Sequence, residues 1–359
     1  MNTMVRLPHR RTLATAASAV RLSLDEVRSL AVQTLAVAGL QEKSRLALAD
    51  TITAAERDGC KSHGLFRLPH IVDGIRLGKV DPNSVPEVID KAPGAVLVQA
   101  RRGMSTLAFQ AGLPSLVKKA KENGVAVMSI VDVFHYSALW PEMEALAAEG
   151  LVGMAFLTSK SFVAHHGGSR KVYGTNPMAF GFPRADGHPP LIWDQASAMM
   201  ARGEITLHGQ EGKLLPHGCG VGPDGQPSNE PAAVLAGSQL PFGGHKGSAI
   251  ALMVELLASG LTGAPLSSQQ REEDVDSRDA SPTRAGELVL AINPGVTSAV
   301  GGAGAVAAHC ESLFAEILGD EGTRLPSSRR YQMRETTPVT GVEVPGWLHD
   351  AIIERRGPP

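Results

Sequence analysis

The 359-residue sequence has few cysteines, few aromatic residues and almost no net charge. Cys60, Cys219 and Cys310 are far apart and form no Cys-x-x-Cys pair, which argues against a disulfide framework and a structural zinc site. A net charge of -2 and an aromatic content of 4% indicate no nucleic-acid-binding surface. Apolar runs are too short for a membrane-spanning helix. The sequence therefore favours a protein of a reducing compartment that binds a small molecule.

Acidic residues are also absent from residues 1 to 24, which are rich in Arg, Ser, Thr and Ala. This composition is typical of an organellar transit peptide. A disordered tail, or a start at Met4, explains it equally well. We therefore set residues 1–21 apart as an N-terminal extension. We expect a cytoplasmic protein, or a mitochondrial or plastid one if the extension is a transit peptide.

The apolar pattern predicts alternating strands and helices. Ser23 is a predicted N-cap for a helix that ends at Gly39. Alternation of buried strands with helices is typical of an α/β fold, and the length suggests two or three domains. The other predicted helices are 42–57, 106–123, 138–148, 246–261 and 304–318; the strands are 95–100, 125–131, 151–158, 191–194 and 287–293; the loops are 81–93, 212–231, 267–284 and 324–330.

A Rossmann fingerprint is absent. The nearest match to G-x-G-x-x-G is Gly302-x-Gly304-x-x-Ala307, but no second strand follows to carry the acidic residue that binds ribose. We interpret this segment as a helix start only.

Three reactive groups occur within six residues at Ser62, His63 and Arg67. If residues 62–68 are helical, His63 and Arg67 lie on one face, about one turn apart. Arg holds a carboxylate with a planar fork, and His exchanges a proton near neutral pH. This predicts a site for a small acid that gains or loses a proton. The alternative is a surface helix with an incidental Ser-His pair.

Two further segments could bind phosphate. Gly243-Gly244-His245-Lys246-Gly247 combines a close backbone approach, a helix N-terminus and a lysine, but it lacks P-loop spacing. Arg324, Arg329 and Arg330 bracket a turn. A Gly-rich turn and a solvated basic loop are the respective alternatives.

Metal and nucleophile signatures are missing. The histidines have no H-E-x-x-H or comparable spacing, so we predict no metal. Ser62 directly precedes His63, which does not suit the geometry of a Ser-His hydrolase.

Taken in order, these segments resemble one family. Ser62-His63-Gly64 with Arg67, then His135, then Gly174-Thr175-Asn176-Pro177, then Gly243 to Gly247, resemble the malate/L-lactate dehydrogenase-like oxidoreductases, which have no Rossmann fold. Within that family the likeness is closest to the Δ1-piperideine-2-carboxylate/Δ1-pyrroline-2-carboxylate reductases. The segments that carry this likeness are 138–141, 241–248, 253–257, 324–326 and 329–331, and the resemblance covers residues 22 to 335.

The resemblance implies an α/β fold in which a non-Rossmann NADP-binding domain with a mixed sheet, 125–296, is inserted between two segments. These segments, 22–124 and 297–359, would form a substrate and dimerisation domain. It also implies a homodimer that uses NADPH to reduce a cyclic imine carboxylate to L-pipecolate or L-proline.

The resemblance also assigns roles to residues. His63 would donate the proton, Ser62 would belong to a relay, and Arg67 would bind the substrate carboxylate, with Thr175 also touching substrate. The cofactor-binding residues would be His135, Tyr136, Ser137, Ala138, Leu139, Asp194, Gln195, Ala196, His245, Lys246, Arg324, Leu325, Pro326, Ser327, Ser328, Arg329 and Arg330.

Three positions depart from the family pattern. The relay Asp of the reductases is Glu204 here, where the wider family of dehydrogenases has Lys, so an acid favours imine reduction. Val133 replaces a Ser, and Ser327 replaces the Gly of a Pro-Gly turn. The alternatives are a malate- or lactate-type 2-hydroxy-acid dehydrogenase and a catalytically silent dinucleotide-binding protein.

Overall fold

A seven-stranded mixed sheet forms the centre of the protein. The computed structural model describes residues 19–185, 187–270 and 284–356. Only β3 and β4 are parallel; every other neighbouring pair is antiparallel, so the sheet is not of the Rossmann type. The order is β2 (Glu87–Ala92), β3 (Ala95–Met104), β4 (Val125–Phe134), β12 (Arg284–Ile292), β5 (Val152–Leu157), β8 (Met178–Phe182) and β9 (Leu191–Gln195).

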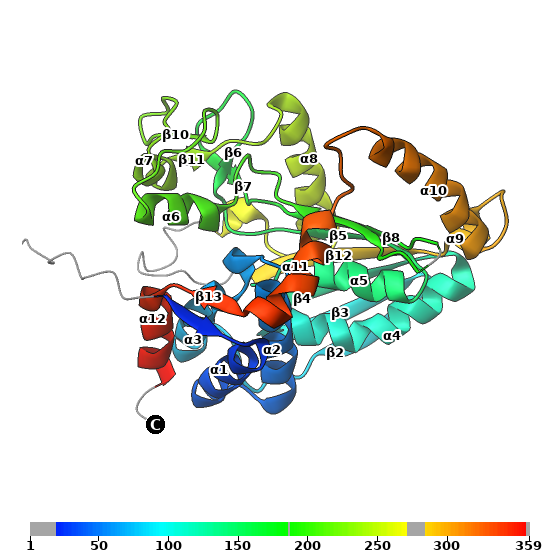
Figure 1. The fold of residues 1–359 in the computed structure, drawn as a ribbon, viewed down its shortest axis with the longest axis horizontal. Coiled ribbons are helices and arrows are strands. Elements are labelled where there is room, and N and C mark those ends of the chain that lie inside the picture. The colour runs from blue at the N-terminus through cyan, green and yellow to red at the C-terminus, as the bar shows by residue number, and fades with distance from the viewer. Residues whose placement is uncertain (1–18, 186, 271–283, 357–359) are drawn as a thin grey trace, which may run out of the picture.

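Helices cover both faces of this sheet (Figure 1). Successive strand residues point to opposite faces, so Ala155 and Val289 pack with α4 (Ser105–Asn123) and α5 (Trp140–Ala148). Phe156 and Leu288 are next to them in sequence and point to the other face. They pack with α8 (His245–Glu255) and with the π-helix η3 (Leu256–Gly260) that continues it.

The two ends of the described chain form a second, mostly helical core beside the sheet. Ser23 and Glu26 form a capping box at the start of α1. The two ends are joined by an antiparallel pair of strands, β1 with β13. The elements are β1 (Val20–Leu22), α1 (Leu24–Val37), α2 (Glu42–Arg57), η1 (Lys61–His63), η2 (Leu65–Arg67), α3 (Leu68–Arg76), α11 (Ser328–Thr340), β13 (Val342–Val344) and α12 (Gly346–Arg356).

A third group of elements surrounds a small four-stranded sheet. Its strand order is β10 (Gly220–Val221), β11 (Ser238–Gln239), β6 (Val163–Ala164) and β7 (Lys171–Tyr173). Near this sheet lie α6 (Arg202–Gln210), α7 (Pro231–Ala236) and η4 (Ser267–Gln269), whereas α9 (Pro294–Thr297) and α10 (Ala303–Gly319) lie at the other end of the molecule (Figure 1).

The sequence predicted most elements to within a few residues, and the predicted mixed α/β fold is confirmed. Three local predictions were wrong. The expected loop 81–93 contains β2, residues 62–68 form two 3-10 turns instead of one helix, and the expected turn 324–330 ends inside α11. The predicted loop 267–284 lies largely outside the described residues.

The division of the chain into domains stays a prediction. The expected boundary at residue 124 falls between α4 and β4, and strands from both sides of it pair in the central sheet. β1 begins at Val20, just inside the expected extension, most of which lies outside the described residues. Of the helices in the described ranges, none has the length and apolarity required to cross a membrane.

Candidate active site

One cavity of about 950 Å³ collects most of the predicted site residues. It lies where the loop after α2, the loop between β4 and α5, the end of β5, the segment from β9 to α6, and α11 converge. The predicted residues that line it are Ser62, His63, Arg67, His135, Tyr136, Ser137, Ala138, Leu139, Thr175, Asp194, Gln195, Ala196, Glu204 and Arg330.

The loop that carries His63 is held by a buried carboxylate. Glu56, in the last turn of α2, accepts a hydrogen bond from the backbone N-H of Leu65 at 2.7 Å. A Cβ at Gly64 would lie 2.2 Å from Oε1 of Glu56, so only glycine fits between the two 3-10 turns. Burial raises the pKa of Glu56. The break at Gly64 therefore sets the directions of His63 and Arg67.

Ser62 and His63 form a direct side-chain pair. The Oγ of Ser62 lies 3.0 Å from Nδ1 of His63. Burial, and then the nearby Arg67 and His135, lower the pKa of His63 to about 3. The imidazole is therefore neutral in the free protein, and it can accept a proton from a neighbour or pass one along.

Arg67 directs an unsatisfied guanidinium toward the cavity. Its Nε is buried and has no hydrogen-bond partner. Burial lowers the pKa of Arg67, but a guanidinium stays charged at neutral pH. A buried cation needs an anionic partner, and a ligand carboxylate is the group that suits its fork.

Thr175 is fixed by hydrogen bonds on both sides. Its backbone N-H donates to Oγ of Ser159 at 2.9 Å, and its carbonyl accepts from the N-H of Ser197. The next residue, Asn176, is fully buried with φ +40°. Its Nδ2 donates to the carbonyl of Ala251 and to Glu255. These contacts hold the Thr175 hydroxyl at the cavity wall.

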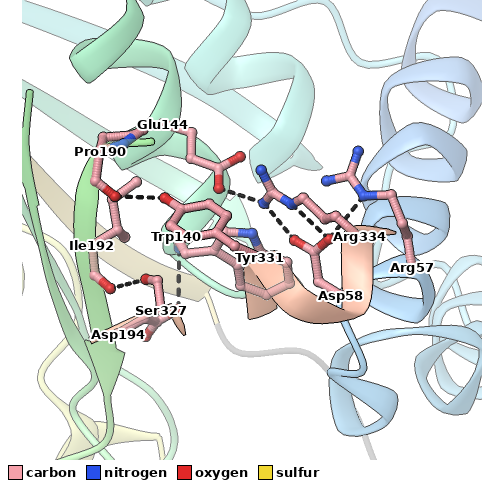
Figure 2. Close-up of polar contacts among 10 residues, drawn as sticks. All are labelled: Arg57, Asp58, Trp140, Glu144, Pro190, Ile192, Asp194, Ser327, Tyr331 and Arg334. Carbon is pink, nitrogen blue, oxygen red and sulfur yellow. Dashed lines mark hydrogen bonds and ion pairs between the residues drawn. The ribbon is translucent and has the colours of Figure 1, made fainter. Parts of the chain in front are cut away.

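The segment from His135 to Leu139 is anchored by Asp194. Oδ2 of Asp194 accepts hydrogen bonds from the N-H groups of Leu139 at 2.7 Å and Trp140 at 3.1 Å, which caps α5 from the neighbouring strand. Burial raises the pKa of Asp194, although these two hydrogen bonds act in the opposite direction. Figure 2 shows Asp194 beside Trp140.

Arg330 also faces the cavity, from the first turn of α11. Its Cζ lies 4.8 Å from the centre of the Trp140 ring, and its Nη1 is buried without a partner. Like Arg67, it has one buried nitrogen without a hydrogen bond. Such a group suits an anionic ligand.

The other predicted cofactor residues do not line this cavity. His245 and Lys246 are exposed at the N-terminus of α8, where the His245 ring contacts the His166 ring at 5.9 Å between centroids. Leu325 is buried. The exposed residues of this group are Arg324, Pro326 and Arg329, and the partly buried ones are Ser327 and Ser328.

Ser327 has a backbone conformation that glycine adopts more easily than serine. Its φ is +72°, a left-handed conformation that serine adopts with strain. Its hydroxyl donates to the carbonyl of Ile192, while Tyr331 donates to Pro190 at 2.6 Å (Figure 2). These bonds hold the start of α11 against the segment that leads into β9.

Glu204 lies at the cavity wall and is exposed. Its neighbour Gly203 is close to the reactive loop, since a Cβ there would lie 3.8 Å from Cβ of Ser62. In the described part of the chain, the Glu204 carboxylate has no hydrogen-bond or ion-pair partner. Glu204 thus lies near Ser62 but does not form a hydrogen bond with it.

Sequence reasoning missed the acids that support the site. Glu56 lies in an amphipathic helix, and Glu142 and Glu287 surround His135 from α5 and β12. A charged residue in the otherwise apolar stretch of β12 was the signal that could have identified Glu287. It also missed Lys160, which is buried and lines the cavity.

Residues 22–353 match the family described as malate/L-lactate dehydrogenase, and the chain belongs to this family.

The chain is also similar to proteins named as carboxylate reductases. The chain is 46% identical to Delta(1)-pyrroline-2-carboxylate reductase 1 of Burkholderia ambifaria over 334 residues, covering 93% of this chain and 97% of that protein. It is 45% identical to the Delta(1)-pyrroline-2-carboxylate/Delta(1)-piperideine-2-carboxylate reductase of Pseudomonas aeruginosa over 336 residues, with coverage of 93% and 98%. The crystal structure of delta1-piperideine-2-carboxylate reductase from Pseudomonas syringae superposes with a TM-score of 0.87 and 36% identity, covering 94% of this chain and 99% of that one.

Proposed function

We propose that this protein uses NADPH to reduce a cyclic imine that carries a carboxylate, Δ1-pyrroline-2-carboxylate or Δ1-piperideine-2-carboxylate, to L-proline or L-pipecolate. The observation that carries the proposal is the placement of Arg67, with its unpaired Nε, in the same cavity as the Ser62–His63 pair. The names of similar proteins support the same substrate class.

The residues present fit a nicotinamide dinucleotide. The buried, unpartnered Nη1 of Arg330 supplies a cationic contact, and the segments 135–139 and 194–196 line the cavity. A volume of about 950 Å³ is at the upper end of the range of small-molecule sites, roughly 300 to 1,000 Å³. When bound, the cofactor supplies a hydride. We propose NADPH because Arg324, Arg329 and Lys246 are exposed basic groups suited to a 2'-phosphate.

Arg67 would bind the substrate carboxylate. A planar guanidinium forms two parallel hydrogen bonds to a carboxylate, so it sets the orientation of the ring as well as its position. Thr175, in the loop between β7 and β8, would contact the same substrate. With its orientation fixed, the imine carbon would present one face to the hydride, so a single enantiomer of the product would form.

His63 would deliver the proton to the imine nitrogen. Its imidazole is neutral in the free protein because burial, and then the nearby Arg67, lower its pKa. A carboxylate bound at Arg67 offsets this positive charge, so substrate binding raises the pKa of His63. Ser62 and Glu204 would then form the relay that returns a proton to His63.

The test is a substrate panel with the full-length protein. We expect NADPH to be oxidised with either cyclic imine, more slowly with NADH, and not with pyruvate or oxaloacetate. Turnover of malate or lactate without imine reduction would assign the protein to the 2-hydroxy-acid dehydrogenases. A homodimer and a cytoplasmic location are also predictions, and sedimentation tests the first.

A further inference from the structure

Two buried acids form a cluster with the imidazole of His135, which lines the cavity. Nε2 of His135 is 3.7 Å from Oε2 of Glu287 and 3.8 Å from Oε1 of Glu142. The three side chains are 2%, 0% and 6% exposed, respectively. His135 follows β4, Glu142 is in the first turn of α5, and Glu287 is in β12, which pairs with β4. Three elements thus meet at one point.

Within the described ranges, no residue outside this cluster forms a hydrogen bond with its side chains. Nε2 of His135, Oε2 of Glu142 and both carboxyl oxygens of Glu287 are buried and form no hydrogen bond. Among the described residues, no Lys or Arg pairs with either acid. Two adjacent carboxylates in a closed space cannot both be charged, so the pair must keep a proton between them.

The surroundings decide which acid is charged. Glu142 lies in the first turn of α5, where the helix dipole favours an anion. Glu287 is inside a sheet and has no such support. Burial raises the pKa of Glu142 to about 7 and raises that of Glu287 well above its usual range. The proton therefore belongs to Glu287, and the carboxylate to Glu142.

The other charged groups that face His135 do not replace this pair. Asp194 is already occupied by the N-H groups of Leu139 and Trp140. Arg67 and His63 lie on the cavity side, and as cationic or neutral groups they provide no carboxylate acceptor. The Glu142 carboxylate is thus the acceptor that remains for Nε2.

We propose that Glu142 and Glu287 are a positioning pair for His135: they share one proton, and the Glu142 carboxylate accepts the Nε2 proton. Nε2 of His135 now lies 3.8 Å from Oε1 of Glu142, and a ring movement of about 1 Å would bring the two atoms to hydrogen-bond distance. A neutral imidazole with its proton on Nε2 keeps Nδ1 bare. His135 lines the cavity, so it presents Nδ1 there as a hydrogen-bond acceptor.

The ligand group that such an acceptor recognises is an N-H donor. The primary carboxamide of a nicotinamide ring has two N-H bonds and fits this requirement. This step rests on the proposed function, because it needs a nicotinamide cofactor in the cavity. Glu142 and Glu287 then act on the cofactor through His135, without touching it.

Two nearly isosteric substitutions separate the roles of the acids. Gln has the shape of a protonated Glu, so Glu287→Gln should leave NADPH affinity within about threefold of wild type. Glu142→Gln removes the carboxylate and should weaken NADPH binding by about 10-fold or more, the range for loss of a hydrogen bond to a charged group. The dissociation constants are measured by cofactor fluorescence, with folding checked by circular dichroism.

A cofactor analogue makes the test specific. Nicotinic acid adenine dinucleotide phosphate carries a carboxylate instead of the carboxamide and offers no N-H. Wild type and Glu287→Gln should bind it at least 10-fold more weakly than NADP+, whereas Glu142→Gln should discriminate less between the two. Equal discrimination in all three proteins would overturn the proposal.

Two measurements on the wild type need no variant. Nitrogen-15 NMR of labelled histidine should show His135 protonated at Nε2; a proton on Nδ1 would overturn the proposal. A stoichiometric divalent metal in the purified protein would also overturn it, because a metal would replace the shared proton. If the binding pattern holds and no imine is reduced, the pair stands and the proposed substrate falls.

Discussion

The guanidinium of Arg334 in α11 forms two hydrogen bonds with the carboxylate of Asp58 at the end of α2, at 2.8 and 2.5 Å. Arg57 also donates to Asp58, and Arg334 reaches Glu144 of α5 (Figure 2). Asp58 precedes the loop of His63 by five residues, and Arg334 follows Arg330 by one helical turn. This network therefore joins α5 and α11, which line the cavity, to the end of α2, where the loop of His63 begins.

Arg334→Gln should destabilise the fold. Asp58 is fully buried and Arg334 is 24% exposed, so loss of the pair leaves a buried charge with one fewer partner. We expect the free energy of unfolding to fall by about 2 to 3 kcal/mol at pH 7. Chemical denaturation measures it, and Arg329→Gln, exposed on the same helix, is the matched control with little change.

The effect should also depend on pH. Burial raises the pKa of Asp58, but hydrogen bonds from Arg334 and then Arg57 outweigh it, so the net shift is downward from 3.8. The stability from this pair is thus present above pH 3.8 and is lost as the pH falls through the lower native value. Wild type and Arg334→Gln should therefore converge in acid, and a constant difference would contradict this account.

His63→Gln should lose turnover and keep the cofactor. General acids contribute about 10²- to 10⁴-fold, so kcat should fall by at least roughly 100-fold while NADPH affinity stays unchanged. In wild type, kcat should fall as the pH rises through the pKa of His63 in the substrate complex, which lies above its value of about 3 in the free protein. A pH profile that is the same in His63→Gln would remove His63 from the reaction.

Arg67→Lys should weaken substrate binding more than turnover. Lysine keeps the charge but loses the planar fork, so KM for the imine should rise roughly 10-fold, and Arg67→Met should raise it roughly 100-fold. Steady-state kinetics at saturating NADPH give both constants. Cofactor affinity is the internal control, and an unchanged KM in Arg67→Met would contradict the carboxylate role.

Glu204→Gln tests the relay. If Glu204 supplies protons toward Ser62 and His63, kcat should fall about 10-fold at neutral pH with little change in either KM. Glu204→Asp, which keeps an acid at this position, should keep most of the activity. The idea is rejected if Glu204→Gln turns over like wild type.

Glu142→Gln should be more stable than wild type above neutral pH. Burial raises the pKa of Glu142 from 4.5 to about 7, so the folded protein binds the proton more tightly than the unfolded chain. The associated stability is complete below pH 4.5 and is lost as the pH rises through 7. Removing the charge should add roughly 1 to 3 kcal/mol at pH 8 and almost nothing at pH 4. Thermal unfolding at both values checks this.

Local patterns predicted the buried strands well because β4 and β12 are largely apolar over the length of a strand. They failed at β2, an edge strand whose Glu, Asp and Lys resemble a loop. They also failed at residues 62–68, because the contact that breaks the helix comes from Glu56, outside that segment. The site residues could be grouped by family resemblance, but the acids around His135 come from segments about 7 and 150 positions away, which no local periodicity reports.

The hydrogen bond from Leu65 to Glu56 has a practical consequence for engineering. The directions of His63 and Arg67 depend on Glu56, which does not line the cavity, whereas Met199 and Met200 line it from the segment between β9 and α6. A library aimed at larger or smaller rings can therefore vary these two side chains. It should leave Glu56 and Gly64 unchanged, since altering either would shift the reactive groups of every variant at once.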